Sequence, residues 1–164
     1  MRFQVAPLPR SNCGTIGLVG VDVTVETVIE RPVAEVAAYA GDPSNSVEWY
    51  SNIRSVHWQT SPPAAIGSCI EFVAYFLGRR LAYTYEIIEL DPGSRLVMRT
   101  AQGPFPMETT YEWSQAADTS TLMRLRNRGE PAGFGRIAAP VLAAAVRRNT
   151  TKDLARLRSL LESR

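Results

Sequence analysis

Histidine, lysine and cysteine are scarce in this chain of 164 residues, and each scarcity excludes a kind of site. The single histidine, His57, excludes a histidine-rich metal centre, and no spacing of metal ligands or phosphate-binding glycine loop is recognisable. Cys69 has no evident base beside it, so neither a Cys/His nor a Ser/His/Asp arrangement can be assembled. The sequence therefore predicts no catalytic residue, no metal and no cofactor.

Long apolar runs are also missing, which excludes a membrane-spanning helix, since such a helix needs roughly 18 or more consecutive apolar residues. The first 20 residues contain scattered proline and arginine and do not resemble a signal peptide. Without an export signal, the two cysteines are expected to be reduced thiols in a cytoplasmic protein. We expect residues 1–20 to form a tail or an extra edge strand, and residues 21–164 to form one domain.

The charged residues are distributed unevenly along the chain. Residues 1–120 hold 8 basic and 13 acidic side chains, whereas residues 121–164 hold 10 and 3. A basic end can indicate contact with nucleic acid or with an anionic membrane. Here the arginines of the last predicted strand have acidic partners across the sheet, so no nucleic-acid partner is expected.

Residues 69–129 contain four or five alternating strands whose charges pair when the turns between them are closed. The turn at residues 91–94, Asp-Pro-Gly-Ser, places Glu86 opposite Arg99. Turns near residues 103–104 and 117–119 then place Arg99 opposite Glu108 and Glu108 opposite Arg128. In the same register, Glu112 lies between Arg95 and Arg124. These opposite charges fix the register more than they stabilise the sheet, because each pair contributes only about 0.2–1 kcal/mol.

The first hairpin of this series is predicted to turn at Gly78-Arg79, which places Phe72 opposite Tyr85. That register also brings two like charges, Glu71 and Glu86, to face each other. The other side of the strands is apolar with a few polar groups. It carries Phe72, Tyr83, Tyr85, Ile87, Leu96, Met98, Met107, Thr109, Tyr111, Trp113, Met123, Leu125 and Asn127.

Helices flank the strands on both sides in sequence. Residues 22–29 alternate as a strand, Pro32 begins a helix that ends at Gly41, and a short helix over residues 45–50 precedes a strand over residues 53–59. A long helix is predicted over residues 137–162. We therefore expect an α+β fold in which a curved antiparallel sheet faces a long terminal helix.

The terminal helix has one apolar side on which polar residues intrude. At helical spacing this side collects Leu142, Ala143, Val146, Thr150, Leu154, Leu157 and Leu161. Thr150 lies within it and Asp153 at its margin. One interpretation is that both point into a cavity; the other is that Thr150 bonds to its own helix backbone and Asp153 faces solvent.

Several segments resemble one known family. They are RPVAEVAAYAGDP at residues 31–43, EWYSNI at 48–53, EIIELDPGSRLVMRT at 86–100, GEPAGFGRIAAP at 129–140 and DLARLRSLLE at 153–162. In their order they resemble the polyketide cyclase/dehydrase branch of the START-like superfamily, also called SRPBCC or Bet v 1-like. The resemblance implies a helix-grip fold with a hydrophobic cavity between the sheet and the terminal helix. Members bind lipids, sterols, quinones, polyketides or plant hormones, and some catalyse cyclisation or dehydration.

The resemblance and the inner-face pattern together give a predicted site. Connecting segments that this fold places near the cavity entrance carry Trp49 and Phe105, which would form a gate if exposed and cap the core if buried. The residues predicted to contact the ligand are Tyr83, Tyr85, Met98, Thr109, Tyr111, Asn127, Val146, Thr150 and Asp153.

Three functional hypotheses follow. The first and favoured one is a noncatalytic protein that binds a small hydrophobic molecule, lipid-like or polyketide-like. The second is a polyketide cyclase or dehydratase in which tyrosines, Asn127, Asp153 or His57 move a proton; it loses support if His57 and Asp153 are both exposed. The third is a module that binds a macromolecular partner through basic residues of the terminal helix such as Arg147 and Arg148.

Overall fold

Seven antiparallel strands form one curved sheet in the order β1-β7-β6-β5-β4-β3-β2, in a computed structural model that describes residues 20–130 and 138–164. The strands are β1 Val21–Ile29, β2 Ile53–Trp58, β3 Cys69–Phe76, β4 Arg79–Asp91, β5 Arg95–Gln102, β6 Met107–Ala117 and β7 Ser120–Gly129. The helices are α1 Val33–Ala40, the 3-10 helix η1 Pro43–Asn45, α2 Ser46–Trp49 and α3 Ala139–Glu162. The predicted tail or extra strand falls on residues 1–19, outside the described residues.

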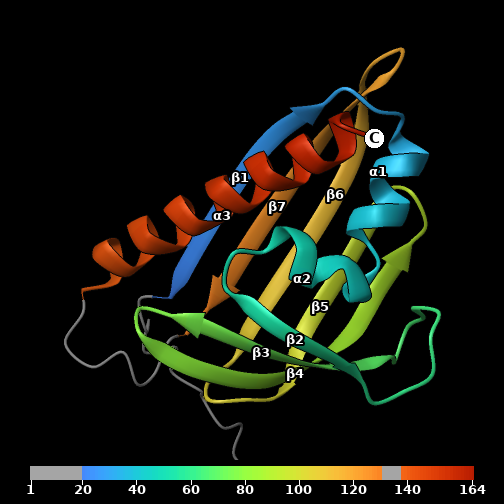
Figure 1. Cartoon of the computed structure of the whole chain (residues 1–164). Coiled ribbons are helices and arrows are strands. Elements are labelled where there is room, and N and C mark those ends of the chain that lie inside the picture. The colour runs from blue at the N-terminus through green and yellow to red at the C-terminus, as the bar shows by residue number, and fades with distance from the viewer. Residues whose placement is uncertain (1–19, 131–137) are drawn as a thin grey trace, which may run out of the picture.

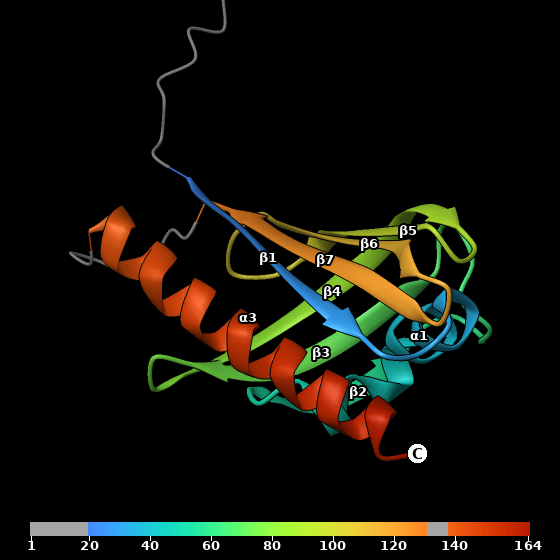
Figure 2. The ribbon, with the colours of Figure 1, turned by 90° about the horizontal axis from the view of Figure 1, so that it is seen from above.

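Helix α3 crosses the concave side of the sheet along its whole length (Figure 1). Viewed from above, the sheet bends strongly: β1 and β7 lie along one side of α3, whereas α3 crosses over β3 and β2 (Figure 2). Helices α1 and α2 lie toward the end of the sheet where α3 finishes (Figure 1). This arrangement confirms the predicted helix-grip fold.

Local sequence explains where the first helix begins and ends. Pro32, with φ fixed near the helical value, occupies the N-cap of α1, and Val36 is fully buried on its inner side. The helix ends at Gly41, where an added Cβ would lie 2.6 Å from the carbonyl oxygen of Ala37 and 3.3 Å from the ring of Trp113. Only glycine lets the chain leave the helix this close to the sheet.

The predicted charge pairs of the last three hairpins are confirmed, although bulges between Ile87 and Glu89 and between Gln115 and Ala117 shift the pairing beside two of the turns by one residue. Glu86 lies opposite Arg99, and Arg99 lies opposite Glu108. Glu108 lies opposite Arg128, with Nη2 of Arg128 3.5 Å from Oε1 of Glu108, and on the same convex face Glu112 pairs with Arg95. These ion pairs are largely exposed, so they add little to stability while marking the convex face of the sheet as its solvated side.

The predicted register of the β3–β4 hairpin is wrong by two residues. The two-residue turn is Leu77-Gly78, not Gly78-Arg79, and Phe72 therefore lies opposite Tyr83. A shift of two residues keeps every side chain on its predicted face, because strand side chains alternate with a period of two. It also places Thr84 opposite Glu71, which removes the expected contact of Glu71 with Glu86.

The main core fills the space between the sheet, helices α1 and α2 and the C-terminal half of α3. Leu154, Leu157 and Leu161 of α3 are at most 1% exposed within it. A second, smaller cluster at the other end joins Leu142 of α3 to Val21, Val23 and Phe105. No helix among the described residues is long and apolar enough to cross a membrane.

Candidate ligand-binding cavity

A cavity of about 160 Å³ lies between the concave face of the sheet and α3. The strands of the sheet and the α2–β2 connection supply one wall, and α3 supplies the other. All nine residues predicted to contact a ligand line it: Tyr83, Tyr85, Met98, Thr109, Tyr111, Asn127, Val146, Thr150 and Asp153. The sheet and the helix therefore enclose open volume at this position.

The cavity opens where the side chains of α3 become small or polar. Val146, Asn149 and Thr150 border the space, whereas Leu157, two turns further along the helix, does not. Leu157 is 0% exposed and packs in the main core. Leu142 near the start of α3 and Asp153 further along it also border the space, so the cavity lies under the first part of the helix and ends before Leu157.

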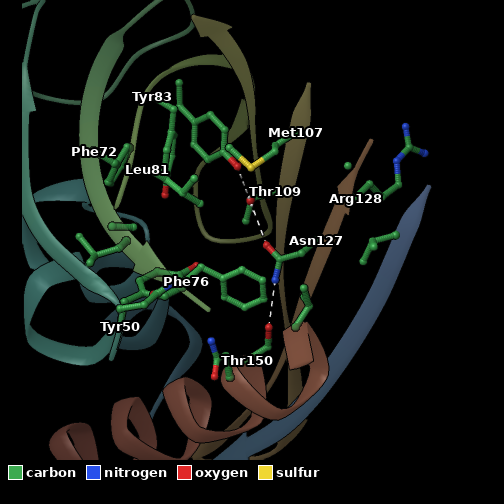
Figure 3. Close-up of a pocket in the computed structure, with 18 of the residues that line it drawn as sticks. Tyr50, Phe72, Phe76, Leu81, Tyr83, Met107, Thr109, Asn127, Arg128 and Thr150 are labelled. Atoms are coloured by element: carbon green, nitrogen blue, oxygen red, sulfur yellow. Dashed lines mark hydrogen bonds between the residues drawn. The ribbon is translucent and has the colours of Figure 1, made fainter. Parts of the chain in front are cut away.

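A chain of hydrogen bonds crosses the cavity wall from β4 to α3. The hydroxyl of Tyr85 lies 3.1 Å from that of Thr109, and the Thr109 hydroxyl donates to Oδ1 of Asn127 at 3.0 Å. Nδ2 of Asn127 in turn donates to the Thr150 hydroxyl at 3.1 Å (Figure 3). Thr150 thus forms a hydrogen bond with the sheet, and its side chain lies at the cavity wall, as the inward interpretation predicts.

The direction of these hydrogen bonds determines which donors and acceptors remain for a ligand. Thr109 has one hydroxyl proton and gives it to Asn127, so Tyr85 must be the donor to Thr109. The lone pairs of the Tyr85 oxygen then remain as acceptors. Burial raises the pKa of Tyr85 to about 12, with the Thr109 hydroxyl working in the opposite direction, so the phenol stays protonated at neutral pH.

A second polar group is the tyrosine pair Tyr50 and Tyr111, which the sequence does not indicate as a pair. Their hydroxyl oxygens lie 2.7 Å apart, and both residues line the cavity. Burial raises the pKa of both hydroxyls above the ordinary value. The Tyr111 hydroxyl and Asp153 raise the pKa of Tyr50 further, whereas the hydrogen bond with Tyr50 lowers that of Tyr111. The two tyrosines are therefore neutral hydrogen-bonding groups, and they lie near the carboxyl group of Asp153.

Asp153 is buried at the cavity wall with 2% exposure, so the interpretation that it faces solvent is wrong. Its Oδ1 accepts a hydrogen bond of 2.8 Å from the backbone N–H of Ser51, in the connection between α2 and β2. Burial raises the pKa of this carboxyl, and the Ser51 groups and two nearby cations, Lys152 and Arg156, oppose the rise. An ionisable group therefore lies where a bound molecule would touch it.

The two aromatic residues predicted at the entrance differ in position. Trp49 is 0% exposed, stacks on Tyr50 with ring centroids 3.9 Å apart and belongs to the main core, so it does not form a gate. Its neighbour Tyr50 takes the place beside the cavity. Phe105 is buried and does line the cavity, at the end formed by the small cluster with Leu142.

Charged groups near the cavity are few. The side chain of Arg128 points away from the space (Figure 3) and pairs with Glu108 on the convex face. His57 is exposed on β2, while the next residue, Trp58, packs toward the core. Within residues 20–130 and 138–164, no cluster of three metal-ligating side chains occurs.

The fold and cavity define a START-like, Bet v 1-like protein. A family model described as polyketide cyclase/dehydrase and lipid transport matches residues 20–162, and the chain belongs to this family. The resemblance predicted from the sequence is thereby confirmed. No curated protein matches the sequence.

Solved structures with the same fold come from bacteria and plants. A START superfamily protein from Mycobacterium smegmatis superposes with a TM-score of 0.76 at 12% identity, covering 87% of this chain and 97% of that one. The Zhui aromatase/cyclase from a Streptomyces species gives 0.71 at 17% identity, covering 88% and 95%. A major latex-like protein from Panax ginseng gives 0.70 at 11% identity, covering 87% and 97%. At these identities the likeness concerns the fold.

Proposed function

We propose that the protein binds a small hydrophobic molecule, lipid-like or polyketide-like, in the cavity between the sheet and α3. The observation that carries this proposal is the open volume itself, since Tyr85, Met98 and Tyr111 border empty space on the side facing Val146. Apolar walls with a few fixed polar groups are typical of sites that bind small organic molecules. Membership in a family described by lipid transport supports the same class of ligand.

The charges favour a neutral ligand over a fatty acid. Asp153 is the acidic group on the wall, and the guanidinium of Arg128 is directed outward. A carboxylate placed in the cavity would be desolvated next to Asp153, and the two cations near Asp153, Lys152 and Arg156, are exposed and do not line the space. The neutral donors and acceptors of Tyr85, Asn127 and Tyr50 suit hydroxyl and carbonyl groups.

The first experiment is native mass spectrometry of the protein purified from its own host, followed by extraction and identification of the retained molecule. A neutral, largely apolar compound supports the proposal, and a protein that carries and accepts nothing opposes it.

The second experiment places bulk in the cavity. Val146→Trp should fill the space under α3 and abolish binding of naphthol, a neutral aromatic probe followed by its fluorescence. Val28→Trp is the matched control, because Val28 is 38% exposed on β1 and does not line the cavity. If both variants bind naphthol like the wild type, the probe does not use this cavity and the proposal fails.

A second candidate function, cyclisation or dehydration of a polyketide, is favoured by the position of Asp153. A buried carboxylate can remove a proton from the carbon beside a ketone, and the hydroxyl of Tyr50 or Tyr111 can donate a hydrogen bond to the enolate oxygen. The carboxyl then returns the proton to the departing hydroxide as water leaves. Asp153→Asn should abolish dehydration of a β-hydroxyketone while naphthol still binds. Equal rates in the variant and the wild type would remove this candidate.

The partner-binding hypothesis has no comparable support. Nη1 of Arg147 donates to the carbonyl oxygen of Thr24 at 3.0 Å, so one of the two arginines proposed to bind a partner contacts strand β1. The hypothesis stays a prediction, as does the cytoplasmic location.

A further inference from the structure

The tip of the β3–β4 hairpin exposes apolar side chains to solvent. Leu77 is 50% exposed in the turn and Tyr75 is 46% exposed just before it. The neighbouring Phe76 and Leu81 turn the other way, line the cavity and pack against the small cluster that contains Leu142. One side of the hairpin thus closes an end of the cavity, and its tip projects outward.

Leucine is an unfavourable residue for the turn that it occupies. Leu77 has φ of 48° and Gly78 has φ of 75°, so both positions are in the left-handed region, as in a type I′ hairpin turn. Asparagine, aspartate or glycine fits the first position, whereas a leucine there is strained. Half of the Leu77 side chain is exposed and its backbone is strained, so this residue contributes little to the stability of the fold.

The charges around the tip have one sign. Arg79 and Arg80 follow the turn and are exposed, and the hairpin carries no acidic residue between Glu71 and Glu86. Arg80 lies directly opposite Tyr75 across the hairpin. Arg54 on the neighbouring strand β2 is also exposed. An apolar tip bordered by arginines matches a lipid surface with anionic head groups, where leucine and tyrosine enter the interface and guanidinium groups bind phosphates.

The start of α3 lies at the same end of the molecule as this tip, in both views (Figures 1 and 2). Val141, the neighbour of Leu142 in that first turn, is 62% exposed. A second exposed apolar group thus accompanies the hairpin near the cavity end that Phe76, Leu81 and Leu142 form. A lipid surface at this end would therefore lie next to the apolar part of the cavity wall.

We propose that the Leu77 turn and the adjacent arginines dock the protein on the surface of an anionic lipid bilayer. This inference goes beyond the proposed function, because it concerns where the protein rests and not what its cavity holds. Binding to vesicles that contain no cavity ligand would support it even if the cavity proves empty.

The test is co-sedimentation of the full chain with vesicles of phosphatidylcholine alone, and with vesicles of equal parts phosphatidylcholine and phosphatidylglycerol. The wild type should bind the second kind and not the first, and binding should weaken as salt rises. Leu77→Asn should lower the partition constant about tenfold by removing the apolar anchor. Arg80→Glu should lower it by about tenfold or more.

Two controls separate docking from misfolding and from general stickiness. Leu77→Asn should melt at the wild-type temperature or above, because asparagine suits the left-handed position better. Ile66→Asn should bind vesicles like the wild type: Ile66 is 68% exposed but lies in the β2–β3 connection, at the end opposite the hairpin tip (Figure 1).

Three outcomes would overturn the proposal. They are failure of the wild type to bind the anionic vesicles, wild-type binding by Leu77→Asn, and an equal loss in Ile66→Asn. If light scattering shows that the wild type self-associates through the tip and Leu77→Asn abolishes this without any vesicle binding, the occupant is a second copy of the chain and not a bilayer.

Discussion

The two halves of α3 differ in how they pack. Leu154, Leu157 and Leu161 are buried in the main core, whereas Val146 and Thr150 line a cavity. The backbone is one continuous helix and the opposing sheet is the same. The side chains differ: leucines pack in the main core in one half, whereas in the other half Val146 and Thr150 border the space and Leu142 closes its end. One half of the helix therefore holds the fold together, and the other half forms the candidate site.

The largest expected effect contrasts the two halves directly. Leu157→Ala should lower the free energy of unfolding by about 2–5 kcal/mol, because it creates a cavity in a filled core. Val146→Ala should cost less than about 1 kcal/mol, because it enlarges space that already exists. Urea unfolding of both variants measures the difference. Equal losses would mean that α3 packs uniformly.

The next effect concerns the tyrosine pair at the boundary between the halves. Tyr111→Phe leaves the buried Tyr50 hydroxyl without its partner and should cost about 1–3 kcal/mol. The double variant with Tyr50→Phe removes both hydroxyls and should regain part of that loss. Denaturant unfolding of the single and double variants tests this. Simple addition of the two single losses would show that the hydroxyls do not depend on each other.

Asp153 gives a smaller effect with a defined dependence on pH. Its pKa is raised above the reference value of 3.8 in the folded state, so folding favours the protonated form. The stability contributed by that form is complete below pH of about 4 and is lost as pH rises through the folded pKa. Asp153→Asn should therefore gain stability relative to the wild type with rising pH. A gap between the two melting curves that stays constant with pH would contradict the raised pKa.

Substitutions on the convex face of the sheet should change stability least. Glu112 pairs with Arg95 and Arg124 in the open, with 37% of its side chain exposed. Glu112→Gln should change stability less than any variant above, and the remaining difference should disappear in high salt. Thermal melting at low and high salt is sufficient. A large loss that persists in salt would mean that the charged face also holds the fold together.

The faces and registers of the sheet could be predicted because they depend on a period of two and on turn residues. The Asp-Pro-Gly-Ser turn at residues 91–94 predicted the Glu86–Arg99 pair correctly, while a bulge between Ile87 and Glu89, which the turn does not indicate, shifts the pairs beside it by one residue. The β3–β4 turn was misplaced because it holds Leu77 at a positive φ, which leucine rarely adopts. The error was an even number of residues, so the side of the sheet that faces the cavity was still identified.

The polar groups of the site were harder to predict. Residues on regular elements, such as Thr109, Asn127 and Thr150, follow from strand and helix periodicity. Trp49 and Tyr50 lie at the end of a four-residue helix, where no period indicates which ring faces the core and which the cavity. Whether Asp153 faced solvent depended on the packing of the α2–β2 connection over it, which the pattern of α3 alone does not contain.

The open volume beneath the first half of α3 is tested most directly by a crystal structure of the protein under xenon pressure, because xenon occupies apolar cavities. The structure predicts xenon density between Met98, Tyr111 and Val146. Absence of that density, with Val146 in contact with the Tyr111 ring, would show that the space beneath α3 is filled and would contradict the proposed cavity.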